Sequence, residues 1–255
     1  ESLHIHRALR QQFEFTGLGN FVKMFGDEVF LRVFANTAIF TLGNVVIAFV
    51  VALLLAYCLS NITHLKGLFI GIILLPWTIP PVSSAVLWGW MLDKMYGAIN
   101  IFLMQLGFQK VFFLGEGPSA MASIIIADAW IRIPLSVLVL YAGLQRVPIT
   151  LIEAALIDGA NAWQTFWRVT FNFIRPEVSM VLILLTMFAW REFSLPWTLT
   201  GGGPENLTEL FGITIFKQAN LYLRYGYAAS IGMFVLIITI FLAVFLFRIR
   251  SKEEA

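Results

Sequence analysis

Asp128 and Arg132 are the two charged residues whose spacing points most directly to a chemical role. They lie four residues apart in the apolar stretch 120–144, and on a helix this spacing puts both side chains on one face, where they can pair. A charge at the centre of a lipid-facing helix costs about 2.5–3.5 kcal/mol, against about 0.3–0.6 kcal/mol gained for each Leu, Ile, Phe or Val. The pair must therefore face protein or water. Two roles are open: a polar lining of a pathway, or a structural pair between helices.

Arg191 and Glu192 form a second charged pair, but they are adjacent in the sequence. On a helix they point to different sides, so each needs another partner. Trp190, Phe193 and Trp197 surround them. Flat aromatic faces beside a bidentate guanidinium donor suit a sugar-binding site, whereas Trp residues also gather in the aromatic belt at a membrane surface. These five residues are candidates for a solute pathway, and the belt remains the alternative.

The segment 146–177 is too polar for a membrane span and too regular for a simple linker. Thr150, followed three residues later by Glu153, predicts the start of a short helix with a capping box. An apolar stripe follows at helical spacing: Leu156, Ala160, Trp163 and Trp167. Gly159 interrupts it and costs roughly 1 kcal/mol against Ala inside a helix. Its position indicates a turn, or a close backbone approach to a partner.

Residue patterns for covalent chemistry or for a bound cofactor are missing from the sequence. There is no Gly-x-x-x-x-Gly-Lys-Ser/Thr loop to cradle phosphates. There is no paired Cys/His spacing for a metal and no Ser/His/Asp set that would make a catalytic site. The single cysteine, Cys58, lies in an apolar run and cannot form an internal disulfide. We therefore predict no catalytic residues, no metal and no cofactor in this chain.

The composition indicates a membrane protein. Of the 255 residues, 59% are hydrophobic and 13% are charged, and the mean hydropathy is +0.84. Soluble domains carry roughly 45–50% apolar and about 25% charged residues, so a soluble core could not bury this much apolar surface. The net charge of +2 is too small to suggest binding of nucleic acid.

Three stretches contain no Asp, Glu, Lys or Arg: Val33 to Leu65, Gly67 to Leu92 and Tyr225 to Phe247. Each is long enough for the helix of about 20 residues that crosses a bilayer. Together with the two charge-interrupted stretches they predict an all-α polytopic fold with five spans, at about 34–60, 67–92, 120–144, 178–200 and 226–247. Outside the spans we expect an extracytoplasmic N-terminal loop over 1–33, a cytoplasmic loop over 146–177 and a cytoplasmic tail over 248–255.

The orientation rests on the charges next to the last span. Arg248, Arg250 and Lys252 follow it directly, and charges so close to a helix end count most in the positive-inside rule. Totals of Lys and Arg on the two sides do not discriminate. Within the second span, Pro76, Pro80 and Pro81 force a kink or break, which leaves open a merely kinked helix or a helix that lines a pathway.

The segment 146–177 carries an extended pattern, made of Glu153, Ala154, Ala155, Asp158, Gly159, Ala160, Phe166, Val169 and Pro176. This pattern resembles the cytoplasmic loop of ABC importer permeases. By this resemblance the segment forms a coupling helix that docks into a cleft of the ATP-hydrolysing subunit. Asn172 stands where the family usually has a proline, which makes the exit geometry of the coupling region a point of departure from the family.

A second stretch is similar to the extracytoplasmic loop of maltose-type sugar permeases, in particular to the first of their two non-identical permeases. It consists of Thr200, Gly201, Gly202, Gly203, Pro204, Thr208, Glu209, Ile215, Phe216 and Ala219. The stretch from Phe15 to Phe21 also resembles the loop that follows the first span of such permeases. This implies six spans in the full family fold, one of them upstream of Glu1.

The resemblance also implies an assembly. The chain would pair with a second permease subunit as a heterodimer, with two ATP-binding subunits that carry ATP and Mg, and with an extracytoplasmic solute-binding protein. The assembly would lie in the cell membrane of a prokaryote, in contact with lipid, and would import a small-molecule solute, a sugar or oligosaccharide, by alternating access.

Other functions are weighed against this one. A secondary transporter should show paired broken helices in two repeated halves, and a membrane-embedded enzyme should show a convergent nucleophile or metal set. The sequence displays neither. Within the importer class, another solute such as a glycerophosphodiester or an amino acid stays open.

Overall fold

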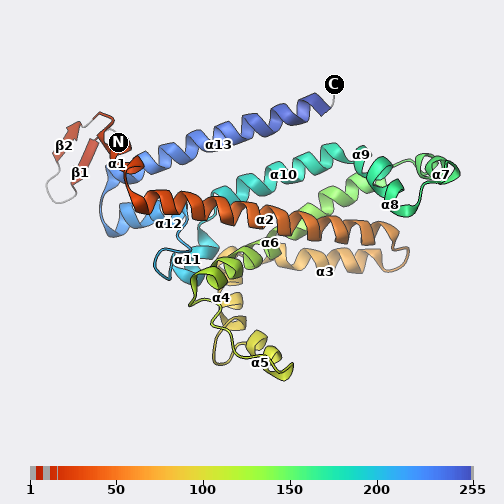
Figure 1. Cartoon of the computed structure of the whole chain (residues 1–255), viewed down its shortest axis with the longest axis horizontal. Coiled ribbons are helices and arrows are strands. Elements are labelled where there is room, and N and C mark those ends of the chain that lie inside the picture. The colour runs from red at the N-terminus through yellow and green to blue at the C-terminus, as the bar shows by residue number, and fades with distance from the viewer. Residues whose placement is uncertain (1–3, 8–11, 16, 254–255) are drawn as a thin grey trace. The chain divides into compact units, whose positions relative to one another are not determined.

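The structure is a computed structural model that describes residues 4–7, 12–15 and 17–253. Its helices divide between two compact units. Unit 1 comprises Glu1–Asn44, Pro80–Asp128 and Met187–Leu242, and unit 2 comprises Val45–Ile79, Ala129–Thr186 and Ala243–Ala255. Figure 1 shows the order of the helices along the chain, and each unit is described below by itself.

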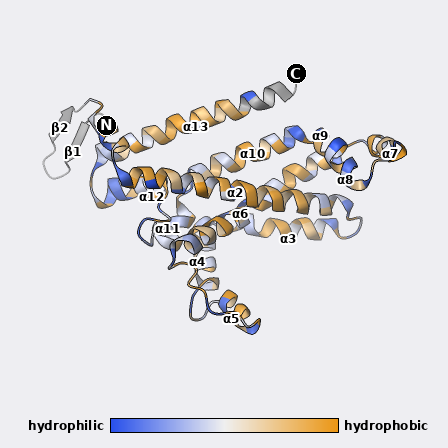
Figure 2. Ribbon diagram, viewed as in Figure 1, coloured by the Kyte–Doolittle hydropathy of each residue, from blue (hydrophilic) through white to orange (hydrophobic). Residues whose placement is uncertain are grey.

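Three helices are long and apolar enough to cross a membrane: α2 (Glu28–Asn61), α6 (Gly117–Gln145) and α13 (Tyr225–Glu253). Their most apolar windows have mean hydropathies of 2.6, 1.9 and 2.8. Apolar residues cover these helices on most sides, as the colouring in Figure 2 shows. Helices that are apolar all round belong in a protein core or in lipid, and large apolar side chains such as Leu42 and Leu54 are more than 60% exposed. Lipid is the surrounding that satisfies both observations.

The remaining elements are short. They are β1 (His4–Arg7), β2 (Gln12–Phe15), α1 (Gly19–Phe25), α3 (Lys66–Thr78), α4 (Pro81–Met91), α5 (Ala98–Gln105), α7 (Ile149–Ile157), α8 (Ala162–Thr165), η1 (Phe166–Thr170), α9 (Phe171–Phe173), α10 (Arg175–Trp190), α11 (Ser194–Thr200), α12 (Phe211–Phe216) and η2 (Lys217–Leu221). Strands β1 and β2 form a small antiparallel hairpin. Counting each strongly bent helix pair as one span gives up to five spans in the part of the chain that the structure describes.

The region predicted as an N-terminal loop, 1–33, is more regular than the sequence suggested. It contains β1, β2, α1 and the first turn of α2. Helix α2 begins six residues before the predicted span because Asp27 Oδ1 accepts a hydrogen bond from the backbone N–H of Val29 at 2.9 Å. A side-chain acceptor at this point satisfies one of the free N–H groups of a helix start.

Two predicted spans are interrupted, the first of them at prolines. The stretch 67–92 divides into α3 and α4, because Ile79 is extended and Pro81 opens the second helix. The stretch 178–200 is likewise not one continuous helix, since α10 ends at Trp190 and α11 begins at Ser194. Pro196 lies in the first turn of α11, where its missing N–H breaks no hydrogen bond of that helix.

Each unit has its own apolar core. In unit 1 one buried cluster consists of Met24, Phe30, Val33, Trp190, Phe211, Tyr227 and Ile231. In unit 2 the buried cluster draws on α2, α6 and α10, with Ala52, Leu59, Leu140 and Val181, and includes Ile174 just before α10. Small residues such as Ala48, Ala52 and Ala56, all fully buried, let helix backbones approach closely, as is usual in membrane helix packing.

Candidate functional site

The segment between α6 and α10, in unit 2, contains the first group of predicted site residues. Helix α7 carries Glu153, Ala154 and Ala155, and it ends in a left-handed turn at Gly159, whose φ is +84°. The N–H of Ala160 donates to the carbonyl of Ala155 at 2.9 Å, and the N–H of Gly159 donates to the carbonyl of Leu156 at 3.1 Å. These two bonds make a Schellman motif. Gly159 therefore serves a turn, one of the two roles predicted for it.

The start of α7 differs from the prediction. Pro148 precedes the helix and no side chain caps it, so the predicted capping box of Thr150 and Glu153 is wrong. Pro148 fixes the backbone before the first turn and leaves Thr150 inside the helix. A capping box does form one helix later. Asn161 Oδ1 accepts from the N–H of Gln164 at 2.9 Å, and Gln164 Oε1 accepts from the N–H of Asn161 at 3.0 Å.

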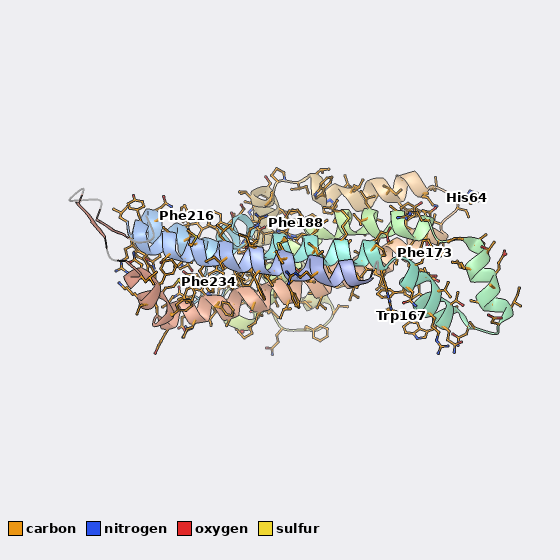
Figure 3. The ribbon with its side chains drawn as sticks, turned by 90° about the horizontal axis from the view of Figure 1, so that it is seen from above. His64, Trp167, Phe173, Phe188, Phe216 and Phe234 are labelled. Atoms are coloured by element: carbon orange, nitrogen blue, oxygen red, sulfur yellow. The ribbon has the colours of Figure 1, made fainter. Side chains whose placement is uncertain are left out.

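The predicted apolar stripe is divided by the turn at Gly159, so its residues do not share one helix. They still contribute to an exposed apolar surface. Ile157 is 87% exposed and Trp163 is 71% exposed. Figure 3 shows Trp167 and Phe173 on the short turns between α7 and α10. We call the exposed residues Ile149, Leu151, Leu156, Ile157, Trp163, Trp167 and Phe173 the apolar face of the segment.

Beneath this face, aromatic contacts and one ion pair hold the segment. Phe166 packs edge-on against Tyr57 of α2, with ring centroids 5.1 Å apart, and against Trp167 at 5.2 Å. Arg146, at the start of the segment, forms an ion pair with Glu177, at its end, at 2.7 Å. The ion pair joins the two ends of the segment, and the contact of Phe166 with Tyr57 attaches the segment to α2.

The other residues of the predicted motif are placed on this frame. Glu153, Ala154 and Asp158 are exposed, and Ala155 and Ala160 are half-buried. At Asn172, where the family usually has proline, the side-chain Nδ2 donates to the carbonyl of Arg168 at 2.7 Å. The chain leaves the segment through the π-helical turn η1, and such turns are frequent at functional sites.

Asp128 is buried within unit 1, with 1% of its surface exposed. Its Oδ2 accepts a hydrogen bond of 2.6 Å from Nδ2 of Asn44 on α2. Arg132 follows one turn later on α6 and is half-buried. The contact between α2 and α6 agrees with a structural role between helices, and the pathway role stays a prediction. Sequence reasoning missed Asn44, because an amide in an apolar run gives no pattern that points to its partner.

The candidate pathway residues separate into two groups in unit 1. Trp190 is 6% exposed and packs against Phe34 and Phe211, with centroids 6.2 and 5.6 Å apart, so it belongs to the core. Phe193 and Trp197 stack on each other, with centroids 5.9 Å apart and planes inclined by 17°. Both are half-buried.

The two charges lie between these groups, at the break that separates α10 from α11. Arg191 is exposed, and its Nε donates to the carbonyl of Met187 at 3.3 Å. Glu192 Oε1 accepts from the N–H of Leu195 at 3.3 Å, at the start of α11. The carboxylate thus satisfies a free N–H of the helix start, while the guanidinium remains accessible.

Phe216 is a third aromatic residue that the sequence reasoning did not assign to the pathway. Its ring centroid lies 4.9 Å from that of Trp197 and 5.4 Å from that of Phe193. We call Phe193, Trp197 and Phe216 the aromatic wall. Phe216 belongs to the second resemblance quoted above, and that was the only signal in the sequence that could have pointed to it.

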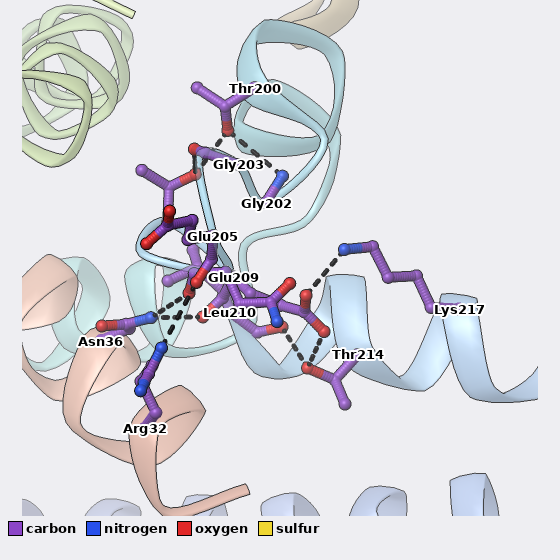
Figure 4. A network of polar contacts seen from close by, with 12 residues as sticks. Arg32, Asn36, Thr200, Gly202, Gly203, Glu205, Glu209, Leu210, Thr214 and Lys217 are labelled. Atoms are coloured by element: carbon purple, nitrogen blue, oxygen red, sulfur yellow. Dashed lines mark hydrogen bonds and ion pairs between the residues drawn. The ribbon is translucent and has the colours of Figure 1, made fainter. Parts of the chain in front are cut away.

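The loop from Thr200 to Leu210 is fastened by buried polar contacts (Figure 4). The hydroxyls of Thr200 and Thr208 lie 2.7 Å apart, and Thr208 donates to the carbonyl of Gly203 at 2.6 Å. The carboxylate of Glu209, 4% exposed, binds Nζ of Lys217 at 2.7 Å. The side chains of Thr200, Thr208 and Glu209 are thereby bonded inside the protein.

Metal chemistry finds no support at these sites. Across the described residues there is no group of three His, Cys, Asp or Glu side chains that could hold an ion.

Comparison with known proteins gives one consistent result. Residues 48–251 match the family model of binding-protein-dependent transport system inner membrane components. The trehalose/maltose transport system permease protein MalF of Thermococcus litoralis is 35% identical over 93% of this chain and 81% of its own length. The sn-glycerol-3-phosphate transport system permease protein UgpA of Agrobacterium fabrum is 30% identical over 94% of this chain and 82% of its own.

The diacetylchitobiose uptake system permease protein DasB of Streptomyces coelicolor is 29% identical over 100% of this chain and 79% of its own. Among solved structures, a bacterial ABC transporter that imports the acidic polysaccharide alginate superposes with a TM-score of 0.82 at 23% identity, covering 96% of this chain and 86% of that one. That likeness supports the fold. The predicted importer permease is confirmed: the chain belongs to the family of binding-protein-dependent transport system inner membrane components.

Proposed function

We propose that this permease imports a carbohydrate. The observation that carries the proposal is the aromatic wall, in which Phe193, Trp197 and Phe216 present half-buried rings. The exposed Arg191 lies two residues before Phe193 in the chain. Aromatic faces give a sugar ring a broad apolar contact, and a guanidinium fork can donate two parallel hydrogen bonds to its oxygen atoms. The trehalose/maltose and diacetylchitobiose permeases among the relatives support this class of solute.

A phosphorylated polyol is the second candidate. The relative from Agrobacterium fabrum transports sn-glycerol-3-phosphate, and an accessible arginine suits a phosphate as well as a hydroxyl group. Uptake of labelled maltose or trehalose, measured beside labelled sn-glycerol-3-phosphate, separates the two candidates.

The second part of the proposal concerns the partners. We infer that the apolar face of the segment between α6 and α10 docks on a cytoplasmic ATP-binding subunit, together with Glu153, Ala154, Ala155, Asp158, Gly159 and Ala160. A second permease would complete a heterodimer, two ATP-binding subunits would carry ATP and Mg, and an extracytoplasmic binding protein would deliver the solute. Exposed aromatic residues on a rigid base are the usual centre of a protein–protein interface.

The C-terminus lies in the cytoplasm in this proposal, which puts the apolar face inside the cell and the loop from Thr200 to Leu210 outside it. Closure of the ATP-binding subunits would pull on the apolar face, and the Schellman turn and the Arg146–Glu177 ion pair would transmit the movement to α6 and α10. Alternating access to the solute then follows from a rearrangement of the helices.

Purification of the intact complex from native membranes tests the proposal. A tagged chain should bring down a second permease, an ATP-binding subunit and a solute-binding protein, and the complex should accumulate labelled maltose or trehalose in proteoliposomes only with ATP present. Recovery without any ATP-binding subunit would contradict the docking role. ATP-driven uptake of sn-glycerol-3-phosphate, with no sugar uptake, would replace the carbohydrate by the second candidate.

A further inference from the structure

The carboxylate of Glu209 binds Thr214 and Lys217, one on each side of Phe216 in the sequence. Its Oε1 accepts from the hydroxyl of Thr214 at 2.9 Å, and its Oε2 binds Nζ of Lys217 at 2.7 Å (Figure 4). The side chains of Lys217 and Glu209 are only 17% and 5% exposed. A buried ion pair is weak grounds for stability alone, because apolar residues of similar volume often serve as well. The ion pair is therefore considered as a constraint on the orientation of α12.

The two attachment points fix the rotation of the helix. Thr214 and Lys217 are three residues apart and lie on one face, whereas Phe216, two residues from Thr214, points to another side. Helix α12 passes into the π-helical turn η2 at Lys217, directly after Phe216. Turning α12 about its axis would break one of the two bonds to Glu209. The direction of the Phe216 ring is set by that constraint.

Glu209 in turn rests on α2. Nδ2 of Asn36 donates to the carbonyl of Glu209 at 3.2 Å and to the carbonyl of Asn206 at 2.8 Å. The N–H of Phe211 donates to the hydroxyl of Thr37 at 3.2 Å. Hydrogen bonds from α2 thus hold in place the backbone that carries the Glu209 carboxylate.

Two glycines leave room for this arrangement. Gly202 has a φ of +90°, and a Cβ added there would lie 3.1 Å from Nζ of Lys217 and 3.2 Å from Cβ of Glu209. A Cβ added at Gly212 would lie 2.9 Å from Cβ of Phe193. The first glycine makes space for the ion pair, and the second lets α12 approach the aromatic wall closely.

We propose that Glu209 and Lys217 are positioning residues that set Phe216 against Trp197, and that Phe216 determines which sugar the aromatic wall accepts. The inference rests on the proposed carbohydrate import and adds to it a solute-selecting residue with its support. Polar contacts of Arg191 orient a solute by its hydroxyl groups, whereas the angle of Phe216 decides the shape of sugar ring that can stack.

The first arm of the test needs no solute. In a Cys58→Ala background, cysteines replace Trp197 and Phe216, and a short bis-methanethiosulfonate reagent links them in the purified complex. Lys217→Gln should lower the yield of the link severalfold, while Lys217→Arg, which keeps the ion pair, should retain it. Arg224→Gln removes an exposed positive charge after the same helix and is the matched control. An unchanged yield in Lys217→Gln would overturn the positioning role.

The second arm measures selectivity in proteoliposomes with saturating binding protein loaded with maltose or with trehalose. Lys217→Gln and Phe216→Leu should each change the ratio of the two uptake rates by about threefold or more, the scale of one aromatic contact. The double variant should change it no further, because both act through one ring. Equal loss of both rates, or additive changes, would reduce the pair to a structural support. If the parent complex carries neither sugar, the proposed function fails and the linking arm still decides the positioning role.

Discussion

Two of the segments by which the sequence resembles importer permeases are built in opposite ways. The segment between α6 and α10 exposes large apolar side chains, with Ile157 at 87% and Trp163 at 71%. The loop from Thr200 to Leu210 buries two polar side chains at its base, Thr208 at 0% and Glu209 at 4%. An apolar surface that stays exposed outside the spans is made to be covered by another molecule. A polar network whose hydrogen bonds are satisfied within the chain makes the loop rigid.

Mutations in the two segments should therefore be detected by different measurements. Truncating the exposed face should weaken assembly and leave this chain folded. Breaking the polar loop should destabilise this chain or redirect its rings and leave the docking surface intact. The variants below separate the two cases, from the largest expected effect to the smallest.

Trp163→Ala should have the largest effect. Loss of a central interface aromatic costs about 2 kcal/mol or more, which is about a 30-fold weaker association with the ATP-binding subunit. Trp163 contacts Trp167 at a centroid distance of 5.5 Å and is otherwise largely exposed, so the thermal stability of the isolated chain should change little. The measurement is titration of the purified permease with the ATP-binding subunit.

Trp90→Ala is the control for that variant, because Trp90 is 76% exposed on α4, away from the apolar face in sequence. It should bind the ATP-binding subunit as the parent chain does. Equal losses for Trp90→Ala and Trp163→Ala would mean that the effect is a general one of removing an exposed Trp.

Thr208→Val should act on the opposite side of the comparison. It removes the hydrogen bonds to Thr200 and to the half-buried carbonyl of Gly203, at a cost of about 1 kcal/mol. Thermal unfolding of the permease in detergent should show the loss. Association with the ATP-binding subunit should stay normal in the variant that remains folded, and weakened association there would contradict the division of roles.

Gly159→Ala and Gly107→Ala form a matched pair. Gly107 has a φ of +85° and Gly159 a φ of +84°, and an added Cβ meets nothing within 4 Å at either position. Gly107 also ends a helix with the Schellman bonds, from Phe108 to Leu103 and from Gly107 to Met104, each at 3.0 Å. The backbone strain should therefore be equal, roughly 1–2 kcal/mol.

Only Gly159→Ala should lower the coupling between ATP hydrolysis and uptake, because only that turn supports the apolar face. The measurement is the number of solute molecules imported per ATP hydrolysed. The same reduction in Gly107→Ala would show that strain, and not docking, lowers coupling.

Asp93→Asn should have the smallest effect. Asp93 lies between α4 and α5, and its Oδ1 accepts from the N–H groups of Tyr96 and Met95, both at 2.8 Å. These backbone bonds lower the pKa of the Asp93 carboxyl. A carboxyl whose pKa is lower in the folded protein stabilises it above the unfolded pKa, and that contribution is lost as the pH falls through the folded pKa.

The parent chain should thus lose slightly more stability than Asp93→Asn as the pH falls into the acidic range where carboxyl groups titrate. Thermal unfolding at neutral and at acidic pH measures the difference. A larger loss of stability in Asp93→Asn than in the parent on acidification would contradict the assignment.

The sequence predicted the features that depend on composition and on local pattern. Apolar stretches free of charge correspond to α2, α3 with α4, and α13, because lipid imposes length and hydropathy on a span directly. The turn at Gly159 was likewise predictable from the sequence, since a glycine after an apolar helical run favours a left-handed turn.

Features that depend on tertiary contacts were not predictable in this way. Phe216 packs against Trp197 of another helix, and Asn44 of α2 contacts Asp128 of α6. The sequence pattern predicts a capping box at Thr150, whereas Pro148 precedes that helix without a side-chain cap and Asn161 caps the next one. Several residues can cap a helix on sequence grounds alone, and the packing of the chain selects among them.

The central claim is that the exposed face between α6 and α10 docks on an ATP-binding subunit, and one measurement tests it most directly. A photo-crosslinking amino acid placed at Ile157, which is 87% exposed, is illuminated in membranes that contain the whole transporter. The account predicts one main product, a covalent link to the ATP-binding subunit, with a yield that changes when ATP is bound. A link to the extracytoplasmic solute-binding protein, or to lipid alone, would contradict it.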